Sequence, residues 1–416
     1  MQANRIPEPV REVCAALERA GFRSWVVGGC IRDLLMDRDV SDWDLATSAL
    51  PTEVRSVFRR TIPTGIQHGT VTVMHRGEGY EVTTLRGDGD YTDGRRPDQV
   101  TLGVDIEEDL ARRDFTVNAI AYDPMQDELV DPFDGMIDLQ ARLIRAVRDP
   151  VERFGEDGLR VLRAARFAST LGFELHEATR DAIPGSLETF SKVSMERVHQ
   201  EWRKAFLKSD EPSRALRIMR ETGILRVTCP PLSETGDELF DAAMRRLDRA
   251  PRDHELRLAA LLLEVKVDGQ ARWVDGWLRA MRASNQERRN VSHLIAVGVG
   301  PQGWVLDPPN VRRWMSRVGR DALEAALTLL RADGRDVDAL EPLVRAELSA
   351  GTPLASSELA INGKDVMQEL DVAPSRAIGE VLAGLLDRVL EDPALGTRER
   401  LLAVLPAAYA EVTKGS

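Results

Sequence analysis

The hydrophobic pattern of this sequence changes at residues 149–150, where an Asp-Pro pair separates two very different stretches. Before this point, short strand-like runs alternate with helical segments. The expected strands are residues 24–27, 43–46, 70–74, 80–85 and 119–122, and the expected helices are 8–21 and 31–36. After it, nearly every segment has the spacing of an amphipathic helix, and Pro150 suits a first helical turn. The chain is therefore predicted to fold as an α/β head followed by an all-α remainder.

The helical remainder is predicted from segments of ordinary helix length, several of which end at a glycine such as Gly172, Gly223 or Gly351. These segments are residues 156–171, 194–208, 212–222, 237–249, 254–265, 285–297, 320–331, 335–349, 375–391 and 395–410.

Length and composition bound the class of protein. A chain of 416 residues exceeds the size of a single core, which stops growing at about 250–300 residues. The hydrophobic fraction of 43% excludes wholesale disorder. No apolar run approaches the roughly 20 residues that span a bilayer, the N-terminus lacks a signal-peptide pattern, and the three cysteines lie far apart. We expect a cytoplasmic protein with no membrane association, and nothing implies a protein partner.

The net charge of −12, from 56 basic and 68 acidic side chains, is unusual for a nucleic-acid binder. It does not exclude one, because phosphate binding needs only a local basic surface.

Two acidic residues, Asp42 and Asp44, are spaced so that a strand would present both on one face. Adjacent ionised carboxylates repel each other unless a cation lies between them, and oxygen ligands of this kind suit Mg²⁺. An exposed acidic edge is the alternative interpretation. Upstream, Gly28-Gly29 lies between a strand and a helix that carries Arg32, as in turns where backbone approaches phosphate. The two features together predict a phosphate site beside a metal site.

A second motif, Glu156-Asp157-x-x-Arg160, is expected on one face of the helix predicted over 156–171. The Asp carboxylate only accepts hydrogen bonds and the Arg guanidinium only donates them. Cytosine and adenine both offer an amino donor beside a ring acceptor and match this pair, whereas uracil and guanine would oppose acceptor to acceptor and donor to donor. The pair could act as a protein template for C and A, or simply form an intrahelical salt bridge.

Other polar residues are weaker indications of a particular function. Arg112-Arg113-Asp114 with Asn118 forms a polar cluster that leads into an apolar run, and a salt-bridged helix end is its alternative interpretation. Arg163 and Arg166 could face phosphate, RNA or solvent.

The segment GGCIRDLLMDRDVSDWDLATSA, residues 28–49, resembles the signature of the class II tRNA nucleotidyltransferase and bacterial poly(A) polymerase family, a branch of the polymerase-beta-like nucleotidyltransferases. Four further blocks agree in the order of the family, and the matches cover residues 25 to 205. The blocks are residues 80–86, 91–97, 109–119 and 156–160.

The resemblance implies transfer of CMP and AMP from CTP and ATP to the 3′ end of tRNA, completing CCA and releasing pyrophosphate. It implies a site with two Mg²⁺ ions, held by Asp42 and Asp44, with Glu81 as a third catalytic carboxylate. Asp157 and Arg160 would then read the base. The other nucleotide-binding residues would be Gly28, Gly29, Arg32, Arg113, Asp114, Asn118 and Arg163.

Four parts are expected along the chain. Residues 1–149 would form the catalytic head and residues 150–210 a helical neck with the base-reading motif. Residues 211–300 would form a helical body that resembles an HD phosphohydrolase module, but Leu263-Glu264 stands where His-Asp is required, so no such activity is expected. Residues 301–416 resemble the tRNA-binding tail of the family.

Three other functions share these motifs: addition of A alone to tRNA ending in CC, polyadenylation, and RNA binding by an inactive scaffold. The last predicts loss of a key carboxylate, and all are present. CC-only enzymes of the family lack the loop that residues 86–98 supply here, so addition of CC alone is not expected.

Overall fold

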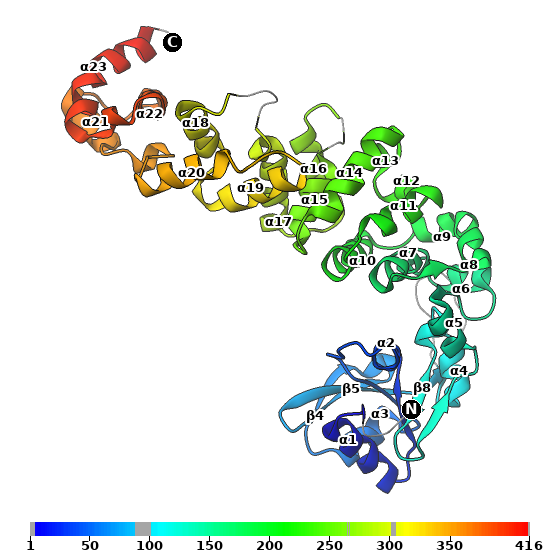
Figure 1. Cartoon of the computed structure of the whole chain (residues 1–416). Helices are drawn as coiled ribbons and strands as arrows, with labels where there is room; N and C mark the ends of the chain where they lie inside the picture. Colours follow the sequence, from blue (N-terminus) through cyan, green and yellow to red (C-terminus); the bar gives the residue numbers. More distant parts are fainter. Residues whose placement is uncertain (1–4, 88–100, 264, 266, 301–304, 415–416) are drawn as a thin grey trace. The chain divides into compact units, whose positions relative to one another are not determined.

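The structure is a computed structural model that describes residues 5–87, 101–263, 265, 267–300 and 305–414 (Figure 1). The chain divides into two compact units, residues 1–234 and residues 235–416. The boundary predicted at 149–150 lies inside the first unit, so the division into four parts stays a prediction.

A seven-stranded mixed sheet forms the centre of the first unit. Its strand order is β3-β4-β5-β2-β1-β8-β9, in which β2 and β5 run parallel and the other neighbours antiparallel. A parallel pair requires a crossover connection, which here contains a helix and the β3–β4 hairpin. The strands are β1 (Ser24–Val27), β2 (Asp44–Thr47), β3 (Thr61–Gly65), β4 (Thr70–His75), β5 (Glu78–Thr84), β8 (Ala121–Asp123) and β9 (Glu128–Val130).

Side chains alternate across this sheet and build two apolar layers, because successive residues of a strand point to opposite faces. On β1, Val26 contributes to one layer, while Trp25 and Val27 contribute to the other. The first layer is covered by α1 (Glu8–Arg19), α2 (Gly29–Leu35) and α3 (Pro51–Val57) (Figure 1). The second contains Leu110 of α4 (Ile106–Ala111). Burial on both faces explains the uninterrupted apolar run at 25–27.

The remaining helices of the first unit follow the sheet in sequence. They are α5 (Gly135–Ala141), α6 (Pro150–Glu156), α7 (Leu159–Leu171), α8 (Glu177–Ala182), α9 (Leu187–Ser191), α10 (Met195–Lys208), α11 (Ser213–Glu221), α12 (Ile224–Thr228) and α13 (Pro230–Ser233). Two small ladders join β6 (Arg86–Gly87) to β7 (Thr101–Leu102) and β10 (Leu143–Ile144) to β11 (Glu174–Leu175).

The five predicted strands are confirmed to within two residues at each end. Two strands of the seven-stranded sheet were not predicted, and neither were the four short strands of the two small ladders. β3 has the sequence TIPTG and is mostly exposed, so it lacks alternating apolar residues, and β9 is only three residues long. The loop predicted at 86–98 is wrong at its start, because residues 86–87 form β6, and residues 88–98 lie outside the described residues.

The helix predicted over 156–171 is wrong at its start, because the helical conformation is interrupted between α6 and α7. Asp157 is extended (φ −143°, ψ 102°), and its Oδ1 accepts a hydrogen bond from the backbone N–H of Leu159 at 3.0 Å. Asp favours such local bonds over a helix interior. The next residue, Gly158, lies against the backbone of α9, where a Cβ would come within 2.6 Å of the Phe190 nitrogen. This packing requires glycine at the break.

Replacing Gly158 by alanine is therefore expected to lower the free energy of unfolding by about 1–3 kcal/mol, the usual cost of overpacking. Gly155, in α6, is the matched control, because a Cβ there meets nothing within 4 Å. Gly155→Ala should be neutral or stabilise by up to about 1 kcal/mol. Thermal melts of both variants test this, and equal melting temperatures would contradict the packing argument.

The second unit contains helices and no strand within its described residues. The helices are α14 (Asp237–Arg249), α15 (His254–Leu262), α16 (Gln270–Ala280), α17 (Asn285–His293), η5 (Leu294–Gly298, a π-helical turn), α18 (Pro308–Val318), α19 (Leu323–Ala332), α20 (Leu340–Ser349), α21 (Gly363–Leu370), α22 (Arg376–Glu391) and α23 (Arg398–Lys414). The sequence did not predict α16, α18 or α21. Among the described residues, no helix combines the length and the apolar character needed to cross a membrane.

Candidate active site

Three carboxylates gather near the start of β2. The parallel register pairs Asp44, the first residue of β2, with Glu81 on β5. Neighbouring strands lie about 4.8 Å apart and paired residues share a face, so these two carboxylates lie side by side. Asp42 was predicted on the same strand, and this is wrong: the ladder begins at Asp44, and Asp42 lies in the loop before it. There Asp42 is exposed and accepts a hydrogen bond from the Ser41 hydroxyl at 2.9 Å.

The charges of this acidic cluster (Asp42, Asp44 and Glu81) act on one another. Packing of protein atoms around the carboxyl group of Asp44 raises its pKa, although the residue as a whole remains exposed. The negative charge of Glu81, and then that of Asp42, raises the pKa further. A raised pKa means that ionised Asp44 is destabilised where it lies. A bound cation would relieve this repulsion.

Arg113 is the basic group that faces the acidic cluster. Its charge lowers the pKa of Asp44, opposing the carboxylates. Its Nη2 bonds to the buried carboxylate of Asp109 at 3.1 Å, and its Nη1 bonds to the backbone carbonyl of Asn118 at 3.4 Å. Gly28 makes room for it, because that residue has a φ of +79° and a Cβ there would lie 2.8 Å from Nη1 of Arg113. The diglycine turn therefore lets Arg113 approach the carboxylates.

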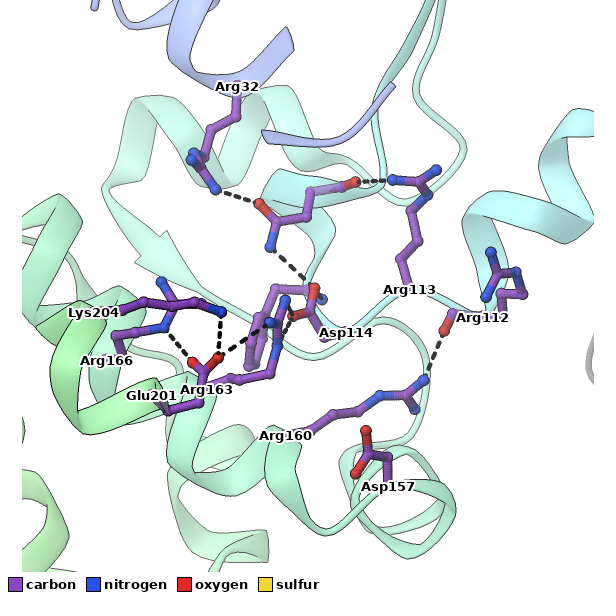
Figure 2. Close-up of polar contacts among 12 residues, drawn as sticks. Arg32, Arg112, Arg113, Asp114, Asp157, Arg160, Arg163, Arg166, Glu201 and Lys204 are labelled. Carbon is purple, nitrogen blue, oxygen red and sulfur yellow. Dashed lines mark hydrogen bonds and ion pairs between the residues drawn. The ribbon is translucent and has the colours of Figure 1, made fainter. Parts of the chain in front are cut away.

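A second group of predicted residues forms a chain of hydrogen bonds from α2 to α7 (Figure 2). Nη1 of Arg32 donates to the side-chain oxygen of Asn118 at 2.6 Å, and Nδ2 of Asn118 donates to Asp114 at 3.0 Å. The other oxygen of Asp114 accepts from Nε of Arg163 at 2.8 Å and pairs with its Nη2 at 2.5 Å. Four residues predicted from three separate motifs are thus held together.

Asp114 is buried, and its partners decide its charge. Burial alone would raise the pKa, but the charge of Arg163 and the hydrogen bonds from Asn118 and Arg163 outweigh it and lower the pKa to about 2. A lowered pKa stabilises the fold above the pKa of the unfolded chain, and this stabilisation is lost as the pH falls through the folded value. The difference from the ordinary value of 3.8 corresponds to about 2 kcal/mol at neutral pH.

Asp114→Asn is expected to lower the free energy of unfolding by about 2 kcal/mol at pH 7. The gap between wild type and variant should shrink as the pH falls from 4 to 2, because over that range the Asp114 carboxylate takes up a proton in the unfolded chain before it does so in the folded protein. Urea unfolding at a series of pH values measures the gap. Asp181→Asn, which alters an exposed carboxylate paired with Arg180, is the control and should show no such trend. Parallel curves for the wild type and Asp114→Asn would contradict the assignment.

Glu201 of α10 extends this chain of hydrogen bonds and was missed by the sequence analysis. It is buried, it pairs with Nε of Arg166, and one of its oxygens bonds to Lys204 at 3.0 Å (Figure 2). Nη1 of Arg163 lies 3.8 Å away. The ring of Phe167 lies beneath the guanidinium groups of Arg32, Arg163 and Arg166, at 5.2, 5.3 and 3.8 Å from their central carbons. No spacing in the sequence links residue 201 to residue 166.

The predicted base-reading pair has a different geometry from the one expected. Asp157 and Arg160 form no salt bridge with each other, because Asp157 lies outside both helices. Arg160 instead pairs with Glu156 at 2.5 Å and donates to the backbone carbonyl of Arg153 at 2.9 Å. It also donates to the backbone carbonyl of Arg112 at 2.8 Å (Figure 2). Oδ2 of Asp157 accepts from Nη2 of Arg197 on α10 at 2.7 Å.

The segment 112–118 links the two groups of residues, through hydrogen bonds to Arg160 and Arg163 and through the charge of Arg113, which acts on Asp44. The side chain of Arg113 faces the acidic cluster, the carbonyl of Arg112 holds Arg160, and Asp114 holds Arg163. Carboxylates, guanidinium groups and a donor–acceptor pair therefore belong to the first unit and are linked through this segment. These groups have the chemistry to bind a metal ion, phosphates and a base.

Family models match three segments of the chain. Residues 24–145 match the Poly A polymerase head domain, and residues 172–235 match the family described as "Probable RNA and SrmB- binding site of polymerase A". Residues 250–405 match tRNA nucleotidyltransferase domain 2. Together with the mixed sheet and its acidic cluster, the first match defines the head as that of a nucleotidyltransferase.

Similar proteins narrow the class further. The chain is 39% identical to the CCA-adding enzyme of Lactobacillus delbrueckii subsp. bulgaricus, over 91% of this chain and 92% of that protein. It is 37% identical to that of Geobacillus thermodenitrificans, over 94% of each. The crystal structure of the Bacillus stearothermophilus CCA-adding enzyme in complex with CTP superposes with a TM-score of 0.80 at 30% identity, covering 99% of this chain and all of that one. The chain belongs to the family of CCA-adding enzymes, the tRNA nucleotidyltransferases. The predicted family, the α/β head with a helical remainder and the class of enzyme are confirmed.

Proposed function

We propose that this chain adds CMP and AMP, from CTP and ATP, to the 3′ end of tRNA and releases pyrophosphate. The observation that carries the proposal is the segment 112–118, in which the charge of Arg113 acts on Asp44 and the carbonyl of Arg112 holds Arg160, the partner of Asp157 in the base-reading motif. Chemistry at a 3′-hydroxyl and recognition of a base then occur at one place. A cytoplasmic location follows, because tRNA, CTP and ATP are all found there.

The acidic cluster fits Mg²⁺. Asp42, Asp44 and Glu81 supply hard oxygen ligands, and the raised pKa of Asp44 reflects burial of its carboxyl group and negative charge that Arg113 only partly offsets. We assign Asp42 and Asp44 as metal ligands, in a site for two ions, and Glu81 as the catalytic carboxylate beside them. When bound, Mg²⁺ activates a hydroxyl nucleophile and stabilises the leaving pyrophosphate.

The nucleotide-binding residues divide into two kinds. Gly28, Gly29 and Arg113 lie beside the acidic cluster, where a close backbone and a guanidinium group can meet phosphate oxygens. The linked side chains hold one another at fixed positions, so they present a rigid polar surface to the ribose and phosphates; they are Arg32, Asp114, Asn118 and Arg163.

The hydrogen bonds of Asp157 and Arg160 leave capacity for a base. Each carboxylate oxygen has two lone pairs, and Leu159 and Arg197 use one on each oxygen of Asp157. Within the described part of the chain, the Nε–H and one Nη2–H of Arg160 have no partner. One acceptor and one donor match the amino group and ring nitrogen shared by cytosine and adenine.

We assign tRNA binding to the helical parts of the chain, with residues 150–210 as the neck, 211–300 as the body and 301–416 as the tail. Two observations support this. Residues 172–235 match a family described by RNA binding, and the Thermotoga maritima CCA-adding enzyme complexed with tRNA shares the fold, with a TM-score of 0.66 at 20% identity.

The proposal is tested by offering one nucleotide at a time to three tRNA substrates that end in the discriminator base, in C or in CC. CTP alone should extend the first two by two and one residues, and ATP alone should extend only the tRNA ending in CC. Failure to add CMP to any substrate would refute the proposal, even if AMP is added.

A further inference from the structure

The carboxylate of Asp157 is held at both of its oxygens. Oδ1 accepts the backbone N–H of Leu159 at 3.0 Å, and Oδ2 accepts Nη2 of Arg197 at 2.7 Å. The two side chains are 22% and 30% exposed, so the pair lies at the edge of solvent rather than inside the core. One of these contacts comes from the same turn of the chain, and the other comes from a helix 40 residues further on.

The second contact sets the plane of the carboxylate. Asp157 lies in extended backbone between α6 and α7, so no helix fixes the direction of its side chain. A single hydrogen bond to Leu159 leaves the group free to rotate about that bond. The guanidinium of Arg197 removes this freedom, and as a permanent cation it donates and never accepts.

Arg197 itself lies on a firmly anchored helix. α10 packs its Trp202 and Phe206 side chains into the core, with an edge-on ring contact of 5.8 Å between them. Its Glu201 pairs with Arg166 of α7, the helix that also carries Arg160. Arg197 therefore reaches Asp157 from an element that is fixed relative to the other half of the base-reading pair.

We propose that Arg197 is a specificity-determining residue that positions Asp157 for base reading. This rests on the proposed function, in which Asp157 accepts the amino group of C or A. Rejection of U and G depends on the same oxygen being held where their carbonyl oxygen would lie. Without Arg197, the carboxylate can turn away, so the favourable contact with C and A and the repulsion of U and G weaken together.

The test is Arg197→Met, which keeps the length of the side chain and removes its charge and donors. The values of kcat/KM for CTP and ATP should fall about tenfold, and those for UTP and GTP should fall much less, so that discrimination relaxes by about tenfold. Arg197→Lys keeps the positive charge and an N–H donor group, so it should recover part of the lost kcat/KM for CTP and ATP and part of the lost discrimination. Arg203→Met is the matched control, because Arg203 is an exposed residue of the same helix for which the described residues offer no ion pair, and it should leave discrimination unchanged.

A double variant separates positioning from a general loss of stability. If Arg197 acts through Asp157, Arg197→Met/Asp157→Ala should discriminate no worse than Asp157→Ala alone. Additive losses, or an Arg197→Met enzyme that keeps wild-type discrimination, would overturn the proposal while leaving the proposed function intact. A wild-type enzyme that does not prefer CTP and ATP would instead refute the proposed function.

Discussion

Replacing Asp44 by alanine is expected to reduce nucleotide transfer by about a thousandfold or more, equivalent to at least about 4 kcal/mol of transition-state stabilisation. The residue begins β2 and pairs with Glu81 across the parallel ladder, and burial and the neighbouring negative charges raise the pKa of its carboxyl group. Its loss removes the carboxylate that we assign as a metal ligand, and no neighbouring side chain can replace it in the same register. Asp42→Ala should behave alike. Binding of tRNA should survive, because we assign it to the helices.

The measurement is single-turnover AMP and CMP transfer with purified protein and Mg²⁺, beside a filter-binding assay with tRNA. Asp39→Ala is the matched control, since Asp39 is an exposed carboxylate in the same loop as Asp42. It should retain activity within a few-fold of wild type. Near-normal turnover by Asp44→Ala would remove the acidic cluster from the mechanism.

Replacing Asp157 by alanine should change which nucleotides the enzyme uses. Under the proposed function, the variant lacks the acceptor that meets the amino group of C or A, and it lacks the atom that repels the carbonyl of U or G. Arg160 remains bound to Glu156 and to the carbonyls of Arg153 and Arg112, so its donors stay in place. We expect kcat/KM for CTP and ATP to fall at least about a hundredfold and the relative use of UTP and GTP to rise.

A loss of stability has to be separated from this effect, because Asp157 also bonds to Leu159 at the start of α7. Asp149 is the matched control: its carboxylate caps α6 through the N–H groups of Val151 and Glu152, and we assign it no part in base reading. Asp149→Ala should lower stability by about 1 kcal/mol and keep the nucleotide preference. If Asp157→Ala shows the same pattern, base reading lies elsewhere in the site.

Local hydrophobic pattern was enough to predict most of the fold. The strand at 24–27 and the helix at 237–249 have patterns set by burial on the sheet and on a helix face, and both are found as expected. Packing between distant segments was not predictable. The break before α7 arises because Gly158 lies against the backbone of Phe190, and no feature of residues 156–171 reveals that contact.

The candidate site was predictable in its residue types and only partly in its contacts. Asp44 and Glu81 are brought together as expected, and Arg32, Asn118, Asp114 and Arg163 are also neighbours. The partners of these side chains were missed, because an ion pair such as Arg197 with Asp157 depends on how α10 packs. Charge alone does not identify a partner 40 residues away.

The central claim is that side chains of one site, without a nucleic-acid template, determine the sequence CCA. The most direct measurement offers all four nucleotides together to a tRNA that ends at the discriminator base and then sequences the 3′ ends. We predict that the products end in CCA, with UMP and GMP rare and no extension beyond the third residue. Products that carry only added A, a long A tail or a mixture of all four bases would contradict the claim.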